Sequence, residues 1–117
     1  MTDSPFAVAT EQVPVEGSTV TVVTIHGEID AHTADQVRSA VDAALSPGAQ
    51  LVVDLSHVTF MDSTGLGVFV TTLKHLRENE GSLDLVITSP RVMKVFELTG
   101  LDVIIPIHED RDTALAR

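Results

Sequence analysis

The sequence QLVVDLSHVTFMDSTGLG at residues 50–67 is the most informative about the fold, because it leads from a strand into the start of a helix. Gln50–Leu55 is a short and nearly continuous apolar run. Such a run is typical of a strand whose two faces are both covered, as in a parallel sheet. After a turn region, Asp62 or Ser63 can cap the helix that follows.

The helix that begins there is expected to reach about Glu80, where Gly81 ends it. Val68–Thr72 is β-branched and aromatic, which favours a strand locally. The length and the helical period of the segment outweigh that preference. The stripe expected to be buried consists of Leu66, Phe69, Val70, Leu73 and Leu76.

Two strands are expected upstream. Phe6–Val13 and Ser18–His26 are rich in Val and Thr, and the short link Pro14–Gly17 joins them. This pattern predicts a hairpin, and Pro14 makes its first strand an edge strand.

A helix is expected after the hairpin. Thr33 is followed three residues later by Gln36, which is a capping-box signature. The run ends at Pro47-Gly48. Its apolar residues recur at helical spacing: Ala34, Val37, Val41, Ala44 and Leu45.

The C-terminal third continues the alternation of strands and helices. Ser89-Pro90 provides an N-cap followed by a proline at the first helical position, and Gly100 provides a left-handed end. The elements expected here are a strand at Leu83–Thr88, a helix from Pro90 to Thr99, a last strand at Val103–Ile107 and a short helix within Asp110–Arg117.

These elements predict a mixed α/β fold in one domain over residues 1–117. An N-terminal hairpin and alternating strands and helices give a four- to five-stranded mixed sheet covered by helices. Functional loops in such sheets lie at the carboxyl ends of the strands. Here these are His26–Thr33, Ser56–Thr64 and Thr88–Pro90.

Composition excludes several classes of function. Seventeen acidic residues against seven Lys and Arg give a formal charge of −10, which disfavours nucleic acid and anionic membranes as partners. The chain has no cysteine, so thiolate chemistry and disulfides are absent. The N-terminus lacks a signal-peptide pattern, and we therefore expect a cytoplasmic protein.

The chemistry is expected where the second helix begins. Unpaired backbone N–H groups and the helix dipole make a helix N-terminus tolerant of negative charge, so a phosphate on an exposed Ser63 would be accepted there. Gly65 and Gly67 allow either the close approach of another surface or tight packing of the helix itself.

Enzymatic alternatives have weaker support. The chain lacks a P-loop and a nucleophile elbow. A hydrolase that uses Ser63 with His32 or His57, oriented by Asp30, remains an alternative without an oxyanion motif. A metal site formed by Asp54, His57 and Asp62 has no ligand spacing to support it. We expect no cofactor, no metal and no catalytic residue.

The two motif regions resemble a known family. Leu51–Gly67 resembles the signature of STAS-domain anti-anti-sigma factors, which are bacterial antagonist proteins of sporulation and general stress responses. Gly27–Thr33, with the sequence GEIDAHT, resembles the other characteristic stretch of that family. The resemblance extends over essentially the whole chain.

The resemblance implies a phosphorylation switch at Ser63, with Thr64 as a second hydroxyl beside it. The unphosphorylated antagonist would bind an anti-sigma factor that is itself a GHKL-type serine kinase, and the sigma factor would be released. The phosphorylated antagonist would not bind until a PP2C-type phosphatase removed the phosphate. The residues expected to bind the partner are Asp30, Thr33, Asp62, Ser63, Thr64, Gly65 and Leu66.

Two further expectations concern the oligomeric state and an alternative function. The chain is expected to be a monomer, because both sheet edges carry a proline and the surface is charged. The alternative function is a STAS scaffold subunit of a stress-signalling complex that phosphorylation does not switch.

Overall fold

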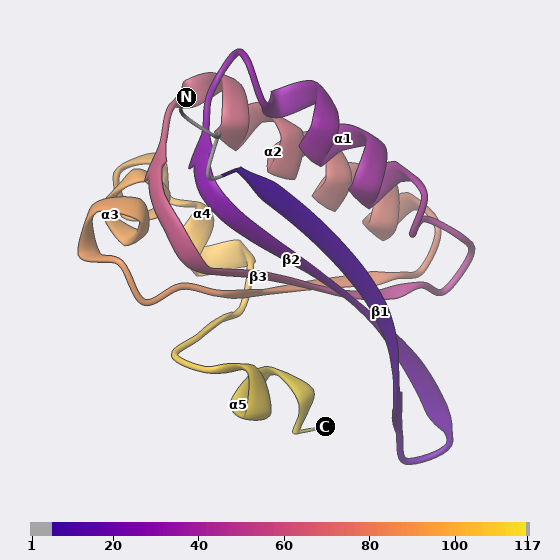
Figure 1. Cartoon of the computed structure of the whole chain (residues 1–117). Helices are drawn as coiled ribbons and strands as arrows, with labels where there is room; N and C mark the ends of the chain where they lie inside the picture. Colours follow the sequence, from indigo (N-terminus) through magenta and orange to yellow (C-terminus); the bar gives the residue numbers. More distant parts are fainter. Residues whose placement is uncertain (1–5, 117) are drawn as a thin grey trace.

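A five-stranded mixed sheet forms the centre of the computed structural model, which describes residues 6–116 (Figure 1). The strands lie in the sheet in the order of the sequence, and β1 runs antiparallel to β2 while the other pairs are parallel. The predicted mixed α/β fold is confirmed. The strands are β1 (Ala7–Val15), β2 (Ser18–Ile29), β3 (Gln50–Met61), β4 (Ser82–Val86) and β5 (Ile107–His108).

The hairpin turn is tighter than the sequence suggested. Glu16 and Gly17 alone connect the strands, with φ angles of 46° and 84°. Two successive residues with positive φ suit the twist of a two-residue hairpin. Pro14 pairs with Thr19 and lies in an edge strand, as predicted.

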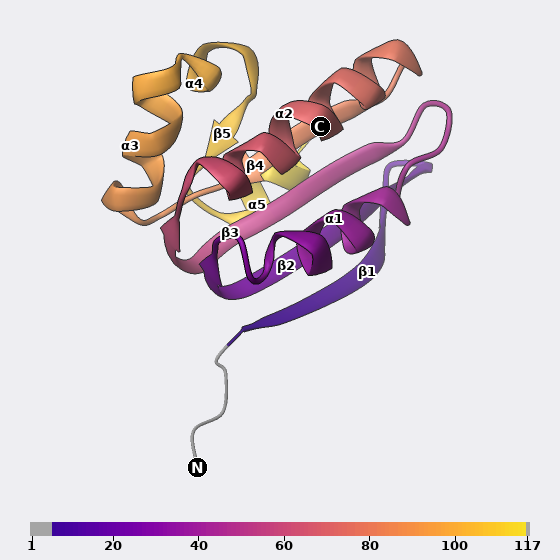
Figure 2. The ribbon, with the colours of Figure 1, turned by 90° about the horizontal axis from the view of Figure 1, so that it is seen from above.

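Helices cover the two faces of the sheet unequally. The first three lie over one face, and the last lies against the other, as the two perpendicular views show (Figures 1 and 2). The helices are α1 (Ala34–Asp42), α2 (Ser63–Glu78), α3 (Pro90–Thr99), α4 (Leu101–Ile104) and α5 (Arg111–Leu115).

The core therefore has a large and a small layer. Phe69 of α2 and Phe96 of α3 are fully buried in the large layer, with ring centroids 6.4 Å apart. The small layer contains Val52 of β3 and Ala114 of α5. Because successive residues of a strand point to opposite faces, both layers need apolar residues from β3, which explains its continuous run.

Two details of the predicted helices were wrong. Val70 was expected in the buried stripe of α2 but is 44% exposed, whereas Val68 and Thr72 are buried. The buried face of α2 is thus rotated away from Val70. The first helix ends at Asp42, before Pro47, and residues 43–49 form turns and irregular backbone that lead into β3.

The second and third strands extend further than predicted. His26–Thr33 and Ser56–Thr64 were expected to be loops, but β2 continues to Ile29 and β3 to Met61. Parallel pairing persists to the ends of both strands, and Val58 and Met61 are buried. The loops at this edge of the sheet are consequently short.

The predicted last strand at Val103–Ile107 was also wrong. Gly100 has a φ of 77° and ends α3, as expected, but the chain then forms the helical turn α4. Only Ile107–His108 pairs with β4. Val103 is 83% exposed, so its apolar side chain did not signal a buried strand.

The N-cap of α5 should make the stability of this helix depend on pH. Asp110 accepts a hydrogen bond from the backbone N–H of Thr113 at 2.8 Å, and this bond, with the Thr113 side chain, lowers the pKa of its carboxyl. The stabilisation of α5 is therefore complete above the ordinary carboxyl pKa of about 3.9 and is lost as the pH falls through the lowered value. We expect the Thr113 amide proton to titrate in NMR spectra with a midpoint below that of unfolded Asp. A midpoint at or above it would contradict the capping bond.

Candidate functional site

The carboxyl ends of β2 and β3 bring the two predicted motifs together. Ile29 and Met61 are register partners at the ends of these parallel strands, and the backbone N–H of Asp62 donates to the carbonyl of Ile29 at 3.1 Å. Neighbouring strands are about 5 Å apart, so the residues that follow them share one edge of the sheet. Asp30–Thr33 and the start of α2 therefore form one site.

Asp62 caps α2, which settles the choice between Asp62 and Ser63. Its Oδ1 accepts hydrogen bonds from the backbone N–H groups of Thr64 at 2.9 Å and Gly65 at 3.0 Å. Its own backbone is extended, as an N-cap requires. Because Asp62 satisfies these amides, the Ser63 hydroxyl is not needed as a cap.

Ser63 is the first residue of α2 and is exposed. Within residues 6–116, no hydrogen bond engages its Oγ. The neighbouring Thr64 is exposed as well. The Ser63 oxygen is thus accessible from solvent and takes no part in the hydrogen bonds that hold the helix start.

The two glycines of the motif differ in their surroundings. A Cβ at Gly65 would lie 2.5 Å from Cγ2 of Ile29 and 3.1 Å from its carbonyl oxygen. Gly65 therefore allows α2 to begin directly against the end of β2. A Cβ at Gly67 would meet nothing within 4 Å. The close contact between α2 and β2 thus explains why position 65 is a glycine. At position 67 the glycine only leaves the outer face of the helix without a side chain.

The loop after β2 is held by its own polar side chains. Asp30 Oδ1 accepts from the backbone N–H groups of His32 at 2.9 Å and Thr33 at 3.3 Å. The Thr33 hydroxyl accepts from the Asp30 N–H and donates to the Glu28 carbonyl at 2.8 Å. The capping box predicted for Thr33 and Gln36 was wrong, because the Thr33 side chain points back into this loop.

The residues expected to bind a partner fall into three groups by exposure. Ser63 and Thr64 are exposed. Asp30, Thr33 and Asp62 are half-buried. Gly65 and Leu66 are buried, so their burial does not support direct contact with a partner. In the isolated chain these two residues position the exposed pair instead.

The geometry does not support the hydrolase alternative. No hydrogen bond within residues 6–116 joins Ser63 to His32 or His57, and the bonded oxygen of Asp30 accepts backbone amides. The His57 ring stacks on His26, with centroids 4.4 Å apart and an interplanar angle of 4°. Sequence reasoning missed this pair, because their pairing depends on a register shift after Thr24.

The metal alternative lacks a site as well. The Asp54 carboxylate accepts hydrogen bonds from the backbone N–H and the hydroxyl of Ser56. Asp54 and Asp62 are separated by eight residues of extended chain, or roughly 25 Å. In the described part of the chain, no group of three or more His, Asp or Glu side chains could hold a metal ion.

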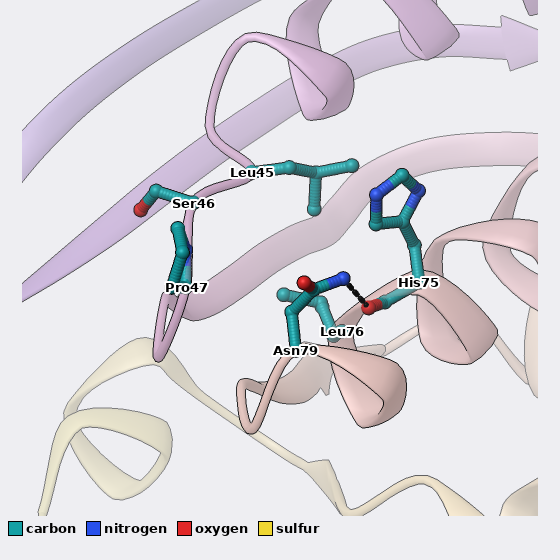
Figure 3. Close-up of a pocket in the computed structure, with 6 residues that line it drawn as sticks. All are labelled: Leu45, Ser46, Pro47, His75, Leu76 and Asn79. Carbon is teal, nitrogen blue, oxygen red and sulfur yellow. Dashed lines mark hydrogen bonds between the residues drawn. The ribbon is translucent and has the colours of Figure 1, made fainter.

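A separate depression of about 190 Å³ lies between the segment that follows α1 and the C-terminal end of α2 (Figure 3). Asn79 Nδ2 donates to the His75 carbonyl at its edge, at 2.9 Å. His75 is twelve residues from Ser63 along α2, or about 18 Å, so this depression is not part of the site. None of the helices described in residues 6–116 is long and apolar enough to cross a membrane.

Comparisons with known proteins agree with the fold and the motifs. The STAS domain family model matches residues 11–114. The anti-sigma-B factor antagonist of Listeria monocytogenes is 46% identical over 84 residues, which cover 71% of this chain and 74% of the relative.

Two solved structures share the fold. The crystal structure of an anti-sigma factor antagonist from Mycobacterium paratuberculosis has a TM-score of 0.78 and 34% identity, over 93% of this chain and 92% of that one. The phosphorylated form of the Bacillus cell-fate determinant SpoIIAA has a TM-score of 0.69 and 28% identity, over 92% and 96%. On this combination of fold, motifs and relatives, the chain belongs to the STAS domain family of anti-sigma factor antagonists.

Proposed function

We propose that this anti-sigma factor antagonist is switched by phosphorylation of Ser63. Unphosphorylated, it binds an anti-sigma factor that is also a GHKL-type serine kinase, and the sigma factor is released. The observation that carries the proposal is the exposed Ser63 hydroxyl, which no hydrogen bond within residues 6–116 engages, beside the Asp62 cap. SpoIIAA, a relative at 28% identity, has a phosphorylated form.

Electrostatics explain how one phosphate would prevent binding. A phosphoserine adds a charge of about −1.5 to −2, and the helix N-terminus offsets only about 0.3–1 kcal/mol of its cost. Docking would bury this charge beside Asp62, on a chain with a formal charge of −10. Burying an unpaired charge costs several kcal/mol. The phosphate therefore blocks the interface while the fold stays intact.

A cycle of three proteins follows from this mechanism. The anti-sigma kinase phosphorylates the antagonist and so ends its own inhibition. A PP2C-type phosphatase removes the phosphate and restores binding. The half-buried Asp30 and Thr33 complete the partner-facing loop beside Ser63. The protein itself acts by binding and contributes no catalytic residue.

The assignment of Ser63 can be tested by intact mass after incubation with ATP and the cognate anti-sigma kinase. We expect a gain of one phosphate in the native chain and in Thr64→Ala, and none in Ser63→Ala. Thr64 is a matched control, because it is the adjacent exposed hydroxyl. A gain that persists in Ser63→Ala would reject the site, and no gain in the native chain would favour an unswitched scaffold.

A further inference from the structure

Exposed apolar side chains gather on three consecutive helices. Five large hydrophobic residues are exposed within residues 6–116, and four of them lie on α2, α3 or α4. We call these four the α2–α4 surface: Val70 at 44%, Leu98 at 76%, Val103 at 83% and Ile104 at 44% exposure. The burial of this much apolar area would favour binding to another surface.

The three helices that carry the α2–α4 surface are joined to one another. Gly100 connects α3 directly to α4, and Arg77 Nη2 of α2 donates to the Ile104 carbonyl of α4 at 3.4 Å. In Figure 2, α3 and α4 lie to the left of α2, and part of β5 is visible between them. Val70 lines a depression of about 350 Å³ together with Leu73, Lys74, Arg77 and Glu78.

Charge distinguishes the three helices that carry this surface from the rest of the chain. The helices α2, α3 and α4 contain four of the seven Lys and Arg residues and three of the seventeen acidic ones, which gives them a formal charge of +1. The remaining three bases and fourteen acids give the rest of the chain −11. The four bases are Lys74, Arg77, Arg91 and Lys94.

We infer that the α2–α4 surface binds a protein segment that is both apolar and acidic. Its apolar side chains would cover Val70 and Ile104, and its carboxylates would face Lys74 and Arg77. Charge complementarity favours such a segment over a basic one. A basic segment would instead be attracted to the acidic parts of the chain outside α2, α3 and α4. This inference goes beyond the proposed function, because it concerns a second binding surface.

Distance makes this second surface independent of the phosphate. Val70 lies seven residues beyond Ser63 along α2, or about 10 Å, and Arg77 lies about 21 Å away. The Debye length at physiological ionic strength is about 8 Å, so a charge on Ser63 is largely screened at Arg77. The antagonist could therefore hold an acidic partner in both phosphorylation states.

The test uses the full chain, labelled with ¹⁵N, and two synthetic amphipathic peptides. Both peptides have leucines at helical spacing, and their other positions carry Glu in one and Lys in the other. We expect the Glu peptide to shift the amide signals of α2 from Val70 onwards and those of Leu98–Ile104. We expect the Lys peptide to leave these signals unchanged. Equal responses to both peptides, or shifts confined to other regions, would overturn the inference.

Three variants and one modified form refine the test. Lys74→Glu and Val103→Ser should each lower the affinity for the Glu peptide by about tenfold. Lys74→Glu reverses a charge that faces the peptide, and Val103→Ser removes exposed apolar area. Arg38→Glu makes the same charge reversal on α1, outside the surface, and should leave affinity unchanged. Protein phosphorylated on Ser63 should bind the peptide as the native chain does.

Two results would assign the surface otherwise. Equal losses in Lys74→Glu and Arg38→Glu would attribute binding to general charge and overturn the inference. Concentration-dependent dimerisation without peptide that Val103→Ser abolishes would identify a second copy as the occupant, and would overturn it too. The unfolding temperature of each variant identifies any loss that is due to misfolding.

Discussion

Phosphorylation of Ser63 is expected to lower the affinity for the anti-sigma partner more than a hundredfold. Ser63 is exposed, so its phosphate would lie at the proposed docking surface, next to the half-buried Asp62. Burial of that charge against the partner costs several kcal/mol, and ~3 kcal/mol corresponds to more than a hundredfold in affinity. Calorimetric titration of one partner with both forms of the antagonist measures the difference.

Two variants separate charge from the loss of the hydroxyl. Ser63→Ala should bind about as tightly as the unphosphorylated chain, because no hydrogen bond within residues 6–116 engages the Ser63 oxygen. Ser63→Glu carries one charge rather than nearly two, and should bind more weakly than Ser63→Ala but more tightly than the phosphorylated form. Unchanged affinity in Ser63→Glu and in the phosphorylated form would reject the charge mechanism.

Alanine at Gly65 is expected to destabilise the fold, and alanine at Gly67 to stabilise it. The new Cβ at position 65 would meet the Ile29 side chain at 2.5 Å, next to the rigid end of β2. Overpacking of this kind costs about 1–3 kcal/mol. At position 67 the Cβ meets nothing, so the higher helix propensity of alanine should add up to about 1 kcal/mol of stability.

Chemical denaturation of the two variants measures both effects in one helix. The pair is matched, since both changes add one methyl group within the first turns of α2. Opposite signs of the change in unfolding free energy are expected. Equal and stabilising changes would mean that α2 does not begin against Ile29 as described.

The order and type of most elements were predictable because local signals agreed with the fold. The apolar run at Gln50–Leu55, Pro14 at an edge and Ser89-Pro90 at the start of α3 each had a single physical reading. Signals failed where tertiary contacts decided the outcome. Pairing between β2 and β3 extends both strands through residues that were expected to form loops. Val103 was predicted to lie in a strand because it is β-branched, but it is exposed in the helical turn α4.

The candidate site was predictable in its residues but not in their roles. The sequence left Asp62 and Ser63 as equal candidates for the cap, and only the hydrogen bonds to Thr64 and Gly65 assign it to Asp62. Gly65 and Gly67 are indistinguishable in the sequence, because the contact with Ile29 arises from the meeting of β2 and α2.

In the proposed switch, a charge on one exposed oxygen at the start of α2 alters the docking surface and leaves the fold unchanged. Amide NMR spectra of the phosphorylated and unphosphorylated chain, recorded without a partner, test this most directly. We expect shifts confined to Asp62–Gly67 and to Asp30–Thr33 across the strand ends. Shifts that extend through α3, β1 and the core would contradict it, since they would show that the phosphate reorganises the protein.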